Sequence, residues 1–189
     1  MRGVQAVKRR VSYADLQRMP EDGNRYELYD GELWVVPAPL LRHQLVAQRL
    51  FVALHEAVKR SGGAAFIAPL DIVFSEYNVI QPDAIYFGPG SARRLRADEL
   101  VRFAPDATFE VLSPSTARND RGRKRNLMAR YLVPEYWVVD PRAHTIEISR
   151  LVENGGYGEP ILVSGGRCPV HAIPGFDIDC ADLFADGLT

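Results

Sequence analysis

The sequence predicts a mixed α/β (α+β) domain, in which a central β-sheet of short strands is flanked by helices. Residues 41–60 carry apolar side chains at helical spacing, and several short apolar runs between residues 64 and 151 are bounded by turn-forming residues, as is typical of strands. The chain has 189 residues, of which 47% are hydrophobic and 25% charged. This length and balance suit one folded domain that buries about 70% of its unfolded surface.

Composition narrows the classes of protein that the chain can represent. A net charge of -1 argues against a basic protein surface, so any nucleic-acid contact needs a local cluster of cations. Cys168 and Cys180 are twelve residues apart and form no Cys-x-x-Cys pair, which argues against a zinc knuckle or a disulfide framework and favours the cytoplasm. No apolar run reaches the ~18 residues of a membrane span, so no membrane partner is expected.

The first elements follow from capping and turn residues. Residues 1–11 are expected to form a flexible basic tail, and residues 12–189 the domain. Ser12 can cap a short helix that ends before Pro20. Asp30-Gly31 separates two strand-like runs and predicts a tight hairpin, which places Glu27 on a strand.

The middle of the chain predicts one long helix and a set of strands. The helix spans residues 41–60 and ends at Gly62-Gly63. Residues 64–68, 71–74 and 79–87 read as strands of one sheet, and a helical turn is expected near residues 98–101.

The remaining elements alternate in the same way. A strand is expected at residues 107–112, a helix at 119–132, and two strands that form a hairpin at 135–139 and 144–151. The C-terminal third is rich in turns.

Two acidic residues break the rules of the strands that contain them. Asp83 follows Pro82 within an apolar run, and the proline removes a backbone donor, so the ladder must be interrupted or at an edge there. Glu110 shares one strand face with Thr108 and Leu112, and a buried carboxylate must be paired, protonated or bound to metal.

A third violation lies on the following helix. Spacing of three and four residues aligns Asp120, Lys124, Leu127, Met128 and Tyr131, so Lys124 falls on the apolar stripe that faces the sheet. Carboxylates that hold Mg²⁺ beside a cation that offsets developing charge suit phosphodiester hydrolysis.

Several ordered segments together resemble the Uma family of restriction-endonuclease-like proteins, within the PD-(D/E)xK nuclease superfamily. The similar segments are Gln81-Pro-Asp83, Phe109-Glu-Val-Leu-Ser-Pro-Ser115, Asp120 with Lys124, Glu135-Tyr-Trp-Val-Val-Asp-Pro141 and the hairpin at residues 26–33. The resemblance implies a restriction-endonuclease-like mixed sheet flanked by helices and a metal site in which Asp83 and Glu110 bind Mg²⁺ or Mn²⁺. It also implies a DNA substrate, expected to be double-stranded, and a homodimer.

The chain departs from the superfamily pattern at Leu112, where a lysine is expected, and the family's pattern suggests Lys124 as the replacement. The leading hypothesis is therefore a Mg²⁺-dependent endonuclease with Asp83, Glu110, Lys124, Glu27 and Asp120 in its site. The alternative is a catalytically inactive nucleic-acid-binding or structural protein that keeps the fold.

Each site residue also has a simpler structural interpretation. Asp83 can be a turn carboxylate, Lys124 a lysine that extends to solvent, and Asp120 a helix cap. Glu27 can be a solvated hairpin residue, and His43 a surface or capping residue. The arginines at 93–96 and 118–125 either bind phosphates or form a solvated surface.

Overall fold

The structure, a computed structural model, describes residues 10–153 and 155–185. Its centre is a mixed six-stranded sheet in the order β10-β9-β8-β7-β6-β3, in which β7 and β8 are parallel and the other neighbours antiparallel. Its strands are β3 (Ala64–Ile67), β6 (Ala84–Phe87), β7 (Ala107–Val111), β8 (Glu135–Asp140), β9 (Thr145–Arg150) and β10 (Ile161–Val163).

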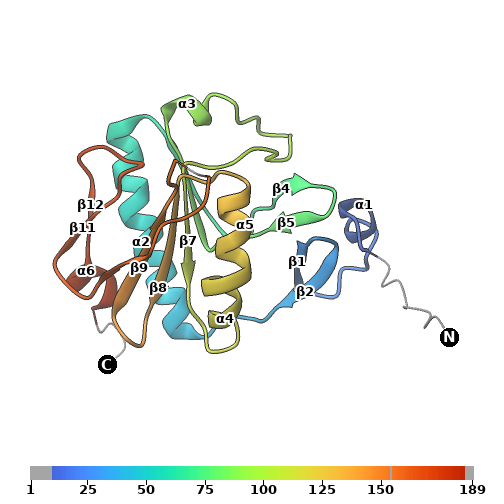
Figure 1. The fold of residues 1–189 in the computed structure, drawn as a ribbon, viewed down its shortest axis with the longest axis horizontal. Coiled ribbons are helices and arrows are strands. Elements are labelled where there is room, and N and C mark those ends of the chain that lie inside the picture. Colours follow the sequence, from blue (N-terminus) through green and yellow to red (C-terminus); the bar gives the residue numbers. More distant parts are fainter. Residues whose placement is uncertain (1–9, 154, 186–189) are drawn as a thin grey trace.

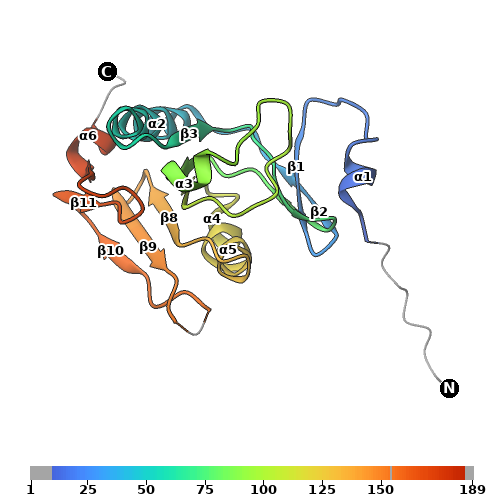
Figure 2. The same cartoon turned by 90° about the horizontal axis from the view of Figure 1, so that it is seen from above.

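Helices cover both faces of this sheet (Figures 1 and 2). One face packs against α2 (Leu41–Ser61), and the opposite face against α5 (Arg125–Arg130). Two short segments lead into α5: α4 (Ala117–Asn119) and a π-helix, η1 (Asp120–Lys124). The α/β architecture with a central mixed sheet agrees with the fold class that the sequence predicts.

A second, smaller antiparallel sheet lies beside the first, in the order β2-β1-β5-β4. It consists of β1 (Arg25–Tyr29), β2 (Glu32–Val36), β4 (Ile72–Ser75) and β5 (Asn78–Ile80). The predicted hairpin is present, and its turn residues Asp30 and Gly31 have φ angles of 52° and 83°. The remaining elements are α1 (Tyr13–Leu16), α3 (Pro89–Ala92), β11 (Arg167–Pro169), β12 (Asp177–Asp179) and α6 (Cys180–Phe184).

Helix α2 anchors one half of the core. One stripe of the helix is buried and packs in one cluster with apolar side chains of β6, β7 and β8. This stripe includes Val46, Leu50, Leu54 and Ala57. The helix ends where Gly62 takes a left-handed φ of 75° and donates its N–H to the carbonyl of Val58 at 2.9 Å. Glycine is favoured at this position because it adopts positive φ without steric strain.

Three expectations need correction. Residues 71–74 and 79–80 pair in the small sheet and not with β3 and β6, so the predicted runs belong to two sheets. The run at 79–87 is two strands, because the chain leaves the ladder at Gln81, Pro82 and Asp83. Residues 98–101 form a turn without a helix, and the short helix of this region is α3.

The predicted basic tail falls largely outside the described residues, which begin at Arg10. The N–H of Val11 donates to the carbonyl of Gly31 at 2.8 Å, and Arg10 donates to the carbonyl of Asp30 at 2.9 Å. In the described ranges, no helix combines the length and apolar character that would let it cross a membrane.

Truncation of the core face of α2 tests the packing. We expect Leu54→Ala to lower the free energy of unfolding by roughly 2–5 kcal/mol, because Leu54 is fully buried and its loss leaves a cavity. Val52 lies on the same helix with 54% of its surface exposed, so Val52→Ala is the matched control. Urea denaturation of both variants measures the difference, and equal losses would contradict the packing described.

Candidate active site

Asp83 lies where the chain crosses from the small sheet to the central sheet. Strand β5 ends at Ile80 and β6 begins at Ala84, so Asp83 belongs to neither ladder. Its Oδ2 accepts a hydrogen bond from the backbone N–H of Val111 at 2.9 Å and lies 3.0 Å from Nε2 of His43. Asp83 is therefore fixed by β7 and α2, two elements distant from it in the sequence.

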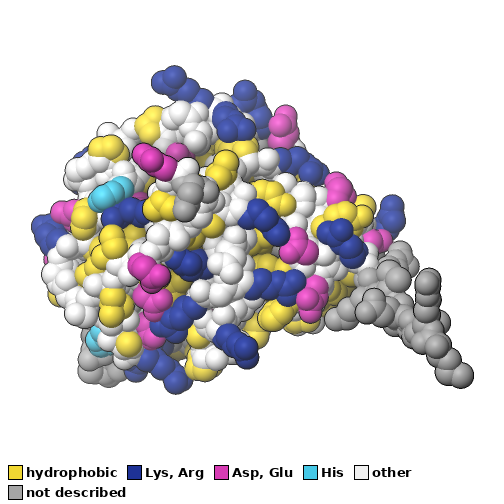
Figure 3. Space-filling view, in the orientation of Figure 1, with side chains coloured by type: hydrophobic (Ala, Val, Ile, Leu, Met, Phe, Trp, Pro, Cys, Tyr) yellow, Lys and Arg dark blue, Asp and Glu magenta, His cyan; other side chains and the backbone are white. Residues whose placement is uncertain are grey.

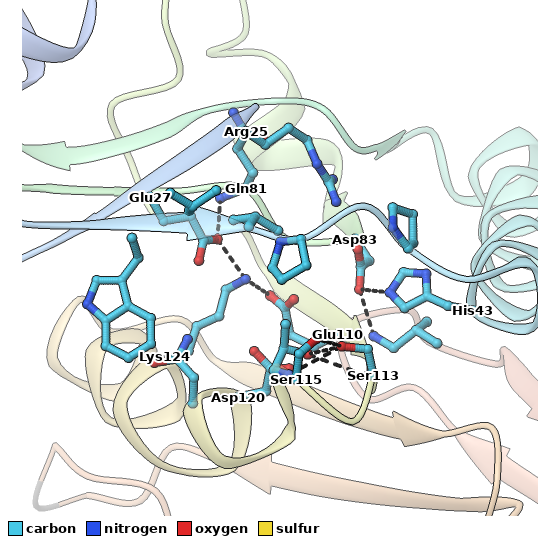
Figure 4. A pocket seen from close by; sticks show the side chains of 18 residues that line it. Arg25, Glu27, His43, Gln81, Asp83, Glu110, Ser113, Ser115, Asp120 and Lys124 are labelled. Atoms are coloured by element: carbon cyan, nitrogen blue, oxygen red, sulfur yellow. Dashed lines mark hydrogen bonds and ion pairs between the residues drawn. The ribbon is translucent and has the colours of Figure 1, made fainter. Parts of the chain in front are cut away.

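Lys124 joins two buried carboxylates from separate strands (Figure 4). Its Nζ lies 2.8 Å from Oε1 of Glu27 on β1 and 2.8 Å from Oε1 of Glu110 on β7. Each of the three residues exposes only 3% of its surface. Lys124 is thus an interior lysine that bridges the two sheets, and the solvent-extended interpretation is wrong for it.

The π-helix η1 presents two polar side chains to the interior. Asp120 and Lys124 are its first and last residues, and both are buried. A π-turn inserts an extra residue into a helix and is frequent at functional sites. Asp120 lines the same cavity as Lys124, and α4 precedes it without a break, so Asp120 lies inside the helical segment and not at the N-terminal cap position.

The site holds more negative than positive charge. Burial, together with repulsion from Asp83, Asp120 and Glu27, raises the pKa of Glu110 well above its ordinary value. Burial also raises the pKa of Asp120 to about 6, although the charge of Lys124 opposes the shift.

Lys124 and Asp83 are held in their charged forms. Burial alone would lower the pKa of Lys124, but the charges of Glu110 and Glu27 raise it above its ordinary value. Burial would likewise raise the pKa of Asp83, yet the hydrogen bonds with His43 and the Val111 N–H and the charge of Lys124 hold it below its ordinary value.

These residues surround a cavity of about 130 Å³, large enough for several water molecules. Glu110 Oε1 is buried in it without an aligned hydrogen-bond donor, although Lys124 Nζ is close. No three His, Cys, Asp or Glu side chains within residues 10–153 and 155–185 form a metal-binding group by themselves.

This donor set fits Mg²⁺ better than zinc. Mg²⁺ is usually held by one or two carboxylates, with waters and substrate phosphates completing its coordination. Asp83 and Glu110 provide two hard oxygen donors at a cavity with excess negative charge. A divalent cation there would offset that charge.

A second layer of hydrogen bonds fixes Glu27. The hydroxyl of Tyr29 donates to Glu27 Oε2 at 2.7 Å, and the backbone N–H of Gln81 donates to Oε1 at 2.9 Å. Asn119 in turn donates to the Tyr29 hydroxyl at 3.0 Å. Glu27 is 3% exposed, so it is not the solvated hairpin residue of the simpler interpretation.

The structure adds two residues to the site: Arg25, to which the sequence assigns no site role, and His43, for which it favours a surface or capping role. His43 is buried against Asp83 and is neither a surface nor a capping residue. Arg25 also lines the cavity. The signal available for both was weak: each lies on the inward stripe or strand face of its element, beside residues already under consideration.

Many surface arginines serve structure. Figure 3 shows cations interspersed with acidic side chains on one face of the molecule. Arg121 pairs with Asp140 and Glu147, and Arg123 pairs with Glu32. The solvated, ion-paired interpretation therefore describes these two members of the 118–125 cluster.

Asp120 gives the stability of the protein a pH dependence. A folded-state pKa of about 6 exceeds the ordinary value of 3.8, so the folded state binds more protons in that window. The free energy of unfolding should therefore fall as pH rises from about 4 to 6. Above about pH 6 the total loss is roughly 3 kcal/mol. We expect Asp120→Asn to be more stable than the native chain at pH 7 and to lose this slope in urea titrations. A native-like slope in the variant would contradict the assignment.

Removal of the buried cation tests the ion-pair cluster. We expect Lys124→Met to cost roughly 3–5 kcal/mol, because Glu27 and Glu110 stay buried without a cation. Adding Glu110→Gln should restore part of the loss. Lys59→Met, which breaks an exposed pair with Glu56, is the control and should change stability little. Denaturation at pH 7 measures all three, and no rescue by Glu110→Gln would argue against a shared cluster.

Known proteins share the overall fold described above. A solved structure from Anabaena variabilis, described as a putative nuclease belonging to DUF820, superposes with a TM-score of 0.78. The match covers 92% of this chain and 97% of that chain at 20% identity, so it shows a shared fold.

Two curated relatives match by sequence. A pantothenate synthetase of Nocardioides sp. is 27% identical over 118 residues, 60% of this chain and 34% of that protein. Pantothenate synthetase 4 of Frankia alni is 28% identical over 137 residues, 69% of this chain and 42% of that protein. The chain thus spans well under half the length of these relatives.

Residues 13–181 match the model of the Uma2 family, which is described as "Putative restriction endonuclease". The match covers every residue assigned above to the acidic site and confirms the resemblance drawn from the sequence motifs. This chain therefore belongs to the Uma2 family.

Proposed function

We propose that the chain is a Mg²⁺-dependent endonuclease that hydrolyses phosphodiester bonds in DNA. The observation that carries the proposal is Lys124, held between Glu110 and Glu27 at a cavity that Asp83 also lines. The Uma2 family and the Anabaena protein are both described as nucleases, which supports the same reaction class.

Asp83 and Glu110 would hold the ion, which when bound polarises a phosphoryl oxygen and activates water. The protein's own part is positional. His43 and the N–H of Val111 hold the Asp83 carboxylate in one orientation. Glu27 holds Lys124, whose ammonium is placed to offset the charge that develops on the phosphate.

Asp120 contributes negative charge to the cavity in this scheme, and Glu27 contributes negative charge in addition to its contact with Lys124. Both raise the pKa of Glu110, and both face the cavity. Their carboxylates therefore favour binding of a cation at that cavity. The predicted homodimer remains part of the proposal, since two sites related by a C₂ axis suit the two strands of a duplex.

A cleavage assay tests this function. Supercoiled, linear and single-stranded DNA are incubated with the protein in Mg²⁺, Mn²⁺ or EDTA. We expect metal-dependent cutting that falls at least ~100-fold in Asp83→Asn, Glu110→Gln and Lys124→Ala. Arg18→Gln, an exposed change on the segment after α1, is the control and should cut normally.

Two outcomes would overturn the proposal. Cutting that persists in Asp83→Asn and Glu110→Gln would belong to another site or a contaminant. No cutting by folded native protein in either metal, with DNA binding retained, would favour the inactive nucleic-acid-binding alternative.

A further inference from the structure

One face of the β1-β2 hairpin forms a wall of the acidic cavity. The antiparallel register sets Glu27 opposite Trp34 and Arg25 opposite Val36. Residues directly opposite each other share a sheet face, so Arg25, Glu27 and Trp34 lie on the same side. All three line the cavity.

Arg25 is a cation at this cavity that has no partner in the described part of the chain. Within the described residues, its guanidinium makes no ion pair and no hydrogen bond, whereas Lys124 is already shared by Glu27 and Glu110. Figure 4 shows the Arg25 side chain reaching over the cavity toward Asp83. A planar guanidinium with unused donors suits a phosphate group.

Trp34 offers an aromatic surface beside that cation. It lines the cavity and keeps 37% of its surface exposed to solvent. The Trp34 and Tyr29 rings pack edge to face with their centroids 5.9 Å apart. The guanidinium carbon of Arg123 lies 5.3 Å from the centroid of the Trp34 ring. These neighbours hold the indole in place, so a ligand that stacks on it loses little side-chain entropy.

The depth of the acidic groups limits what can reach them. Glu110 and Lys124 are each 3% exposed, whereas the phosphates of an intact duplex lie on its outside. A nucleotide that is unpaired or extruded from the base stack can enter a confined site. Enzymes that bind such nucleotides hold the extruded base by stacking it between aromatic side chains. Trp34 and Arg25 are diagonal neighbours on one hairpin face, a relation that typically places backbone positions about 7–8 Å apart, so one nucleotide can contact both side chains.

We propose that Trp34 and Arg25 form a clamp for one unpaired nucleotide at the acidic cavity, with the base stacked on Trp34 and a phosphate bound by Arg25. The inference rests on the proposed nuclease function and deepens it. It names the preferred substrate as single-stranded DNA, or duplex DNA with an unpaired or extruded nucleotide.

Intrinsic fluorescence gives a readout that does not depend on cleavage. The chain has two tryptophans, and Trp137 is fully buried, so only Trp34 is available to a bound base. With Ca²⁺ in place of Mg²⁺, a short single-stranded oligonucleotide should quench the emission. A duplex with one unpaired nucleotide should quench similarly, and a fully paired duplex of equal length should quench less.

Affinity measurements separate the two members of the clamp. We expect Trp34→Ala to weaken single-strand binding by roughly 5- to 150-fold, and Trp34→Phe to retain most of the affinity. Arg25→Gln should reduce the slope of log affinity against log salt by about 0.7, the loss of one phosphate contact. Arg18→Gln, an exposed arginine outside the cavity lining, should leave both quantities unchanged.

The outcomes are distinguishable from failure of the nuclease proposal. The clamp alone would be overturned by two results together: the native protein cuts or binds DNA without a change in tryptophan emission, and Trp34→Ala binds single-stranded DNA with native affinity. Protein that neither cuts nor binds any DNA would overturn both proposals. Circular dichroism of each variant, with Trp34→Phe as the conservative case, ensures that lost binding does not reflect lost folding.

Discussion

The ion pairs of Lys124 are the interaction on which the site depends. Lys124 comes from η1, Glu27 from the small sheet and Glu110 from the central sheet, so one ammonium holds three elements together. Desolvation makes buried ion pairs poor sources of net stability, and apolar replacements of similar size are often neutral or better. The cluster is better explained by what it positions than by what it adds to the free energy of unfolding.

Two departures from regular structure create the space around this cluster. The break at Pro82 ends β5 before β6 begins, which takes Asp83 out of both ladders. The π-helix turns Asp120 and Lys124 inward, and the hydroxyl of Tyr136 on β8 supports it by donating to the carbonyl of Asp120 at 2.9 Å. Such irregularities weaken local hydrogen bonding, and they persist where the surrounding structure requires them.

Local patterns explain why much of the fold was predictable. The Asp30-Gly31 turn, the apolar stripe of α2 and the hairpin of β8 and β9 each depend on residues close together in the sequence. Partition of the strands between two sheets depends on long-range pairing, such as Leu28 with Val79, and no local signal encodes it. The same limit applies to β11 and β12 in the turn-rich C-terminal third.

The residues of the site divide in the same way between local and long-range signals. Asp83, Glu110 and Lys124 were visible because each violates the hydrophobic pattern of its own element, whereas the contact of His43 with Asp83 joins residues 40 positions apart.

The charge balance of the cavity explains why its parts are interdependent. Asp83 keeps a lowered pKa through the hydrogen bond with His43, while burial raises the pKa of Glu110 and Asp120. Lys124 alone does not neutralise these carboxylates, and an ion that did so would stabilise the folded protein through linkage. Under the proposed function, the unneutralised carboxylates that destabilise the metal-free protein are the same groups that would bind the cation, so the energetic cost and the proposed function lie in the same few side chains.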